Sequence, residues 1–194
     1  MRQHQVDPQA TQDYRQSIAE QIGYSRDSKL VIIHADDIAL SQDATDASLQ
    51  AMEWGMVKSG SIMVPCPDFE RASAIWKKNR DLDFGIHLSL TCEWGAKHPW
   101  SPVLPRNEVP TLYNSNGCMW PDYLSLSKHM NTREALMEME AQINKVLQDG
   151  LNPTHLDAHM SIYLVNKVLY KGVLNLSKKY MMPARVSNVK RHRI

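Results

Sequence analysis

The sequence predicts an α/β protein built on a mostly parallel sheet, and two patterns along the chain support this. From Lys29 onward, short apolar runs alternate with longer segments of helical periodicity, as is typical of βα units. Three of the apolar runs also carry Asp or His near their ends, as expected where neighbouring strands meet at one edge of a sheet. The 194 residues are 43% hydrophobic, which is enough for one ordinary domain with its own core.

The expected elements follow the chain in order. Residues 1–28 are polar and are predicted to form an N-terminal extension with one amphipathic helix over residues 12–22. Residues 29–194 form the predicted domain. Its strands are expected at residues 29–34, 61–65, 83–90, 154–157 and 184–187. Its helices are expected at residues 43–56, 69–79, 132–148 and 164–180.

A long insertion without periodicity, at about residues 91–130, separates the third strand from the helix at 132–148. It contains several prolines together with Trp94, Trp100 and Trp120. Long loops of this kind often close over a site, so the segment resembles a lid. The alternative is a surface excursion that its aromatic side chains hold against the domain. The sequence leaves both interpretations open.

Composition excludes several function classes. The 22 basic and 21 acidic residues give a net charge of +1, and the basic run at 190–193 is too short to predict a nucleic-acid partner. No apolar run approaches a membrane span, and no signal peptide is visible, so a cytoplasmic protein without a membrane partner is expected. Three sparsely placed cysteines argue against a disulfide framework and for a reducing compartment.

The candidate functional residues fall near the ends of three predicted strands. Asp36 and Asp37 follow the first, His87 lies late in the third, and Asp157 and His159 end the fourth. Because parallel strands present their carboxyl ends at one rim, these side chains are expected to converge.

One Asp and two His would make a three-ligand metal site with positions left open for water and substrate, which is typical of catalytic rather than structural sites. A second carboxylate would then act as general base. Consecutive strand side chains face opposite ways, so Asp36 and Asp37 are expected to divide these two roles. His155, Asp157 and His159 share one strand face at i, i+2, i+4 spacing. Taken singly, a strand histidine is more often a hydrogen-bonded core residue.

At these motifs the sequence resembles the YdjC-like carbohydrate deacetylases, the family that includes chitooligosaccharide deacetylases. The resemblance runs from about Lys29 to Arg185. It rests on the ordered segments HADDI at 34–38, GIHLSLT at 85–91 and PTHLDAH at 153–159, with PVLP at 102–105 and EVPTL at 108–112 between them.

The resemblance implies a (βα) barrel-like fold and removal of an N-acetyl group from an amino sugar or oligosaccharide. By position, Asp37, His87 and His159 match the metal ligands and Asp36 the general base. His155 and Asp157 are the candidates for protonating the departing amine or for orienting a ligand. Candidate substrate contacts are Arg185, Trp94 and Trp120, and a structural ion pair is the alternative for Arg185. The resemblance implies Mg²⁺, whereas two imidazoles and a carboxylate suit Zn²⁺ or another transition metal.

The chain also departs from the family pattern. Ala39 stands where Gly is common, Thr45 where Asn is common, and the residues after His159 lack the further histidines of many members. An eight-unit barrel needs about 250 residues, whereas about five βα units are expected here, so the domain is predicted to be C-terminally truncated. Its open edges predict a tendency to dimerise or aggregate.

Two alternatives to an active deacetylase remain. The short chain could be an inactive homologue that binds metal or sugar without turnover. More remotely, the Asp pair could serve phosphotransfer, although no phosphate-binding motif accompanies it.

Overall fold

The computed structural model describes residues 17–187, so the basic run at 190–193 and most of the predicted N-terminal helix lie outside the described residues. By its internal contacts the chain divides into residues 1–32 and residues 33–194. In the first unit, α1 (Ile18–Gln21) is a single turn closed by a capping box, in which Ser17 accepts from the Glu20 amide and Glu20 accepts from the Ser17 amide.

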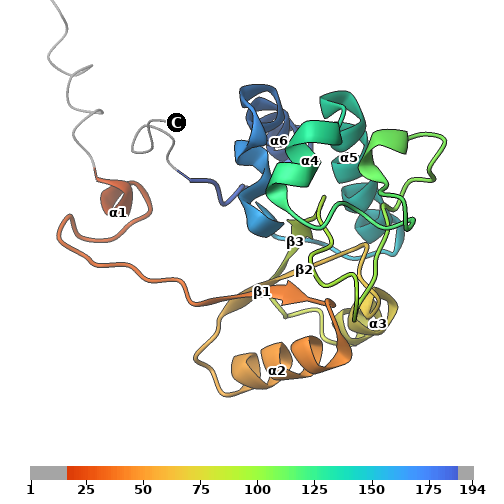
Figure 1. Cartoon of the computed structure of the whole chain (residues 1–194). Coiled ribbons are helices and arrows are strands. Elements are labelled where there is room, and N and C mark those ends of the chain that lie inside the picture. Colours follow the sequence, from red (N-terminus) through yellow and green to blue (C-terminus); the bar gives the residue numbers. More distant parts are fainter. Residues whose placement is uncertain (1–16, 188–194) are drawn as a thin grey trace, which may run out of the picture. The chain divides into compact units, whose positions relative to one another are not determined.

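The second unit is an α/β domain on a parallel sheet, which confirms the predicted fold class (Figure 1). The sheet has the strand order β1-β2-β3-β4, with bounds β1 (His34–Ile38), β2 (Ser59–Ile62), β3 (Phe84–Leu88) and β4 (Leu156–Ala158). Each strand lies beside the one before it, as in a (βα) barrel, whereas the order of a doubly wound sheet reverses. The fifth predicted strand, at 184–187, is reduced to a single bridge between Ala184 and Leu156.

The first strand begins five residues later than predicted. The apolar run at 30–33 forms no strand, and Val31 and Ile32 are about four-fifths exposed. The reason is the register: β1 pairs with β2 from His34 opposite Ser59, and earlier residues have no facing strand among the described residues. Hydrophobicity alone therefore placed the strand too early, and the Asp pair lies within β1 rather than after it.

The four predicted helices of the domain are present, as α2 (Gln42–Glu53), α3 (Phe69–Lys78), α5 (Thr132–Gln148) and α6 (Lys167–Lys179). Three shorter elements were not expected, namely η2 (Pro110–Leu112), α4 (Tyr123–His129) and η3 (His159–Val165). Among residues 17–187, no helix has the length and apolar character needed to cross a membrane.

The two faces of the sheet differ in character because strand side chains alternate. On β3, Phe84, Ile86 and Leu88 belong to the main hydrophobic core, and Phe84 packs edge-on against Trp76 of α3. The intervening Gly85 and His87 lie on the opposite face. That second face carries Ser61, His87 and Asp157, which contact one another and form the floor of the candidate site.

The aromatic residues of the insertion at 91–130 make two hydrogen bonds and a ring contact within the insertion itself. The indole N–H of Trp100 donates to the Thr91 carbonyl at 2.8 Å, and that of Trp120 donates to the Thr111 carbonyl at 2.8 Å. Trp100 is buried, and Trp120 stacks on His129 of α4 with ring centroids 3.9 Å apart. These contacts join parts of the insertion to one another, so the lid and the surface excursion both stay predictions.

A buried carboxylate on α5 anchors the same insertion from below. Glu138 is fully buried, and its two oxygens accept hydrogen bonds from the backbone amides of Val103 and Leu104 at 2.8 and 2.9 Å. Gln142, one turn further along α5, donates to Glu138 at 2.8 Å and also bonds both backbone groups of Ser89. The path of the insertion is thereby tied to the helix that covers β3.

Candidate active site

The Asp pair sits on a β-bulge. The pairing of β1 with β2 shifts register between Ala35 and Ile38, and Asp37 adopts a left-handed conformation with φ 63°. Bulges commonly redirect side chains at functional sites. Here the expectation that Asp36 and Asp37 face opposite ways fails, because both border one cavity of about 520 Å³. The cavity is also lined by His87, His159, Ser161, Tyr163, Arg185 and Ser187.

Three of the predicted residues meet at this cavity. Oδ1 of Asp37 lies 2.9 Å from Nδ1 of His159 and 3.2 Å from Nε2 of His87. Both imidazoles are almost completely buried, whereas the Asp37 side chain is 41% exposed toward the cavity. The predicted convergence of the carboxylate and the two histidines is therefore observed.

Each of these imidazoles has a second carboxylate behind it. Nδ1 of His87 lies 2.6 Å from Oδ1 of Asp157, its register partner on β4. Nε2 of His159 hydrogen-bonds Oε1 of Glu93, a residue of the insertion. Burial would raise the pKa of Glu93, but the hydrogen bond with His159 outweighs it and lowers that pKa. Both histidines are thus held between two carboxylates.

This environment fixes the charges of the metal-free site. Burial would raise the pKa of Asp37, but hydrogen bonds from His159 and His87 hold it well below its usual range. Burial opposes protonation of His159, yet hydrogen bonds to Asp37 and Glu93 raise its pKa to about 9. The pKa of His87 is raised in the same way, against its burial, by Asp157 and Asp37. A cation that entered here would replace imidazole protons.

The buried Asp157 carboxylate contacts four polar side chains. Besides His87, it accepts from the Ser61 hydroxyl at 3.0 Å and from Nη2 of Arg185 at 2.8 Å. Nε2 of His34 lies 3.2 Å from the same carboxylate. Arg185 also bonds Asp36 at the cavity wall. The predicted residues Asp157 and Arg185 therefore join the site, with Asp157 beneath it and Arg185 at its edge.

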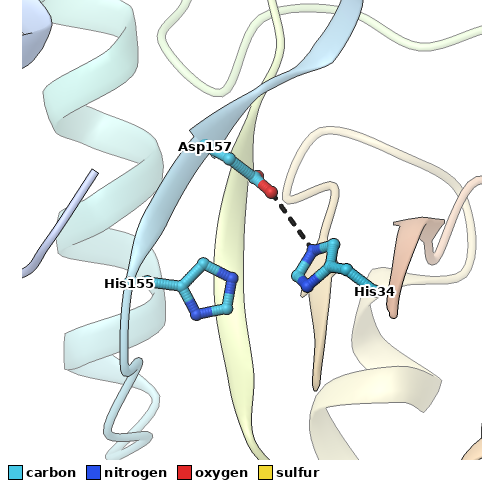
Figure 2. A group of neighbouring side chains, drawn as sticks. All are labelled: His34, His155 and Asp157. Carbon is cyan, nitrogen blue, oxygen red and sulfur yellow. Dashed lines mark ion pairs between the residues drawn. The ribbon is translucent and has the colours of Figure 1, made fainter. Parts of the chain in front are cut away.

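His155 lies beside His34 and Asp157 and does not border the cavity. Figure 2 shows the Asp157 carboxylate directed at the His34 ring, with the His155 ring beside them. The centroids of the His34 and His155 rings are 5.0 Å apart. Nε2 of His155 is buried with no hydrogen-bond partner among the described residues. The ring presses against Gly85, where an added Cβ would come within 2.5 Å of it. Gly85 is therefore needed to make room for His155.

Neither predicted tryptophan borders the cavity. Trp94 is 49% exposed, and Trp120 stacks on His129 within the insertion. Their roles in substrate binding stay predictions.

Sequence reasoning missed three residues of the site. His34 and Ser61 contact Asp157, and Glu93 contacts His159. The position of His34, two residues before Asp36 on one strand, is a signal that could have identified it. Glu93 had no such signal, because it follows the strand in an irregular segment.

The donor set at Asp37, His87 and His159 fits a divalent metal ion. One ligand atom from each lies within 4.8 Å of the others. Metal–ligand bonds of about 2.0–2.1 Å place neighbouring ligand atoms about 3 Å apart, which matches the 2.9 and 3.2 Å distances from Asp37. The backing of each imidazole by a carboxylate is also typical of metal-binding histidines.

Two other groups of side chains, His34–His155–Asp157 and Asp36–His87–Asp157, are close enough to be considered as ligand sets. Both depend on Asp157, whose oxygens are already occupied by His87, Ser61 and the Arg185 guanidinium. A cation beside that guanidinium would be repelled. The Asp37 group is the better candidate.

The structure is that of an α/β protein with an Asp-His-His cluster at the rim of its parallel sheet. The sequence profile of the YdjC-like protein family matches residues 30–193. The chain belongs to this family, as the motifs predicted.

Relatives and a solved structure agree with this assignment. The chain is 31% identical to a carbohydrate deacetylase of Enterococcus faecalis over 81% of this chain and 58% of the relative. It is 34% identical to a carbohydrate deacetylase of Listeria monocytogenes over 80% of this chain and 60% of the relative. A crystal structure of a putative cellobiose-phosphate cleavage protein from Enterococcus faecalis matches with a TM-score of 0.72 and 30% identity, covering 81% of this chain and 59% of that one. The chain thus spans about three fifths of the length of the proteins it matches.

Proposed function

We propose that the chain carries the site of a metal-dependent carbohydrate deacetylase, which hydrolyses the N-acetyl group of an amino sugar or oligosaccharide. The observation that supports this most directly is the placement of Asp37, His87 and His159 on one cavity with Asp36 beside them. The names of the relatives add the substrate class.

A divalent metal held by Asp37, His87 and His159 would polarise the acetamide carbonyl and acidify a water molecule. The chain's own residues then have separate tasks. Asp37 supplies the negative ligand, and the two imidazoles leave one side open toward the cavity. The buried carboxylate of Asp157 fixes the ring orientation of His87, so we assign Asp157 to orienting a ligand rather than to contacting the substrate.

Asp36 is the proposed general base. Among the described residues, its ion-pair contacts with Arg185 and His34 go to Oδ1. This leaves Oδ2 for a water in the cavity. Asp36 would take a proton from the attacking water and give it to the amide nitrogen. The hydroxyl of that water would bond to the acetyl carbon as the C–N bond breaks, which gives the free amine and acetic acid, and the acid then ionises to acetate. Such a role does not require His155, which lies away from the cavity.

The metal itself is the least constrained part of the proposal. Mg²⁺ follows from the family resemblance and normally prefers oxygen ligands, whereas two imidazoles favour Zn²⁺ or another transition ion. Metal analysis of protein purified without added ions is the direct measurement. We expect one divalent ion per chain.

The activity is tested by measuring acetate release from N-acetylglucosamine oligomers, before and after chelation and after metal is restored. We expect release that is lost on chelation and recovered with metal. Release that is indifferent to chelation would refute the metal mechanism. Metal binding without any release would favour the second candidate, binding without turnover.

A further inference from the structure

Glu93 reaches the site from outside the sheet. It follows β3 at the start of the insertion, and its Oε1 accepts a hydrogen bond from Nε2 of His159, while Nδ1 of the same ring faces Asp37 at 2.9 Å. The Glu93 side chain is 25% exposed, and its other oxygen, Oε2, is buried without a hydrogen-bond partner among the described residues. Burying a carboxylate that is only partly satisfied costs free energy. The packing of the insertion alone therefore does not explain this residue.

The contact decides which nitrogen of His159 can bind a metal. A neutral imidazole carries one N–H and one lone pair. If Nε2 carries the proton and donates it to Glu93, the lone pair is on Nδ1 and is available to a cation held between His159 and Asp37. The opposite tautomer would aim an N–H at the metal position and a lone pair at a carboxylate, so both contacts would become repulsive.

The two ligand histidines then use opposite ring nitrogens. His87 faces Asp37 with Nε2 and is backed at Nδ1 by Asp157, whereas His159 faces Asp37 with Nδ1 and is backed at Nε2 by Glu93. The two arrangements are chemically equivalent, although they come from different parts of the chain. This equivalence is the reason to assign Glu93 a role rather than to regard the contact as incidental.

We propose that Glu93 is a positioning residue: its carboxylate holds the proton of His159 on Nε2 and thereby presents Nδ1 as the metal-binding nitrogen. The inference rests on the proposed metal site. Glu93 is not itself a ligand in this proposal and does not touch the substrate.

The test is a titration of the whole chain with Co²⁺, whose visible spectrum reports ligand number and geometry. Glu93→Gln keeps the size of the side chain and removes its charge. We expect Co²⁺ affinity to fall about 10- to 100-fold, with band positions at saturation unchanged. The matched control is Glu108→Gln, the same change at an exposed position of the same insertion, which should bind Co²⁺ as the wild type does. Wild-type affinity in Glu93→Gln would overturn the proposal, and a shifted spectrum at saturation would show that Glu93 is a ligand instead.

A second measurement uses the wild-type chain and so does not depend on how the variant folds. Nitrogen-15 NMR of the ring nitrogens in the Zn²⁺-loaded protein should place the proton of His159 on Nε2 and that of His87 on Nδ1. A proton on Nδ1 of His159 would refute the proposal, as would a wild-type chain that binds no divalent ion. If affinity and tautomer behave as expected but no acetate is released, the role of Glu93 stands and the proposed deacetylase activity fails.

Discussion

The two histidines of the candidate site are held by two different kinds of structure. The strand half, His87 with Asp157 and Ser61, is built from three adjacent strands in regular register. The loop half, His159 with Glu93 and Asp37, is built from a bulge, an insertion and the kinked start of η3, where Met160 and Ser161 have positive φ. The strand half owes its geometry to the sheet, whereas the loop half owes its geometry to local contacts. We therefore expect stability to depend more strongly on the buried polar contacts of the strand half than on the local contacts and backbone conformation of the loop half.

The largest effect should come from Asp36, which belongs to neither half. Asp36→Asn removes the proposed base and should lower the rate of acetate release about 10²- to 10⁴-fold, with metal affinity close to that of the wild type. Acetate release and a metal titration on the same preparation measure the two quantities. A rate within tenfold of the wild type would mean that another group takes the proton.

Asp157→Asn should lower the free energy of unfolding by about 3 kcal/mol, because it removes the buried charge that faces the buried His87 ring and the half-exposed Arg185 guanidinium. Asp36→Asn is the matched control for stability, since Asp36 bonds the same guanidinium but its side chain is 44% exposed. The control should cost less than about 1 kcal/mol. Urea unfolding with chelator present gives both values. Equal losses of stability in the two variants would show that the buried and the exposed carboxylate partners of Arg185 contribute equally to the free energy of unfolding.

The pH dependence of stability should expose the charge of the loop half. The pKa of His159 is raised from an ordinary value of 6.5 to about 9 in the metal-free fold. Its stabilising effect is therefore complete below pH 6.5 and is lost as pH rises through 9. At 1.36 kcal/mol per pKa unit, and allowing for the partners that His159 shares with other groups, we expect the free energy of unfolding to fall by about 2 kcal/mol. The raised pKa of His87 acts in the same direction, while the lowered pKa values of Asp37 and Asp157 matter only in acid.

Urea midpoints measured from pH 6 to pH 9.5 with chelator should fall across this window. With saturating metal the fall should largely disappear, because the metal takes the place of the proton. A flat profile in the metal-free protein would contradict the charged state of His159.

The smallest expected effect tests the backbone strain of the loop half. Ala39 follows the bulge with φ 77°, a conformation that glycine adopts without steric cost. Ala39→Gly should raise the free energy of unfolding by about 1 kcal/mol. The same substitution at Ala135, in the interior of α5, should lower it by a similar amount. A loss at Ala39 would mean that the turn is not strained.

The same contrast explains which parts of the site were predictable. Asp157 and His87 follow from strand periodicity and from the rule that parallel strands share a rim. The bulge at Asp36–Asp37 has no sequence signal of its own, so both carboxylates were expected on opposite faces. Glu93 could not be identified because its position depends on the path of the insertion. The late start of β1 was missed for a related reason, since an apolar run predicts a strand only where a neighbouring strand can pair with it.

Glu138 on α5 attaches the insertion through backbone groups. Its carboxylate accepts hydrogen bonds from the amides of Val103 and Leu104, and these bonds do not depend on which side chains the two residues carry. Substitutions of Val103, whose side chain is exposed, can therefore alter the outer surface of the insertion while its attachment persists. Libraries randomised at position 103 should retain folded protein far more often than libraries randomised at the buried residues Glu138 and Gln142.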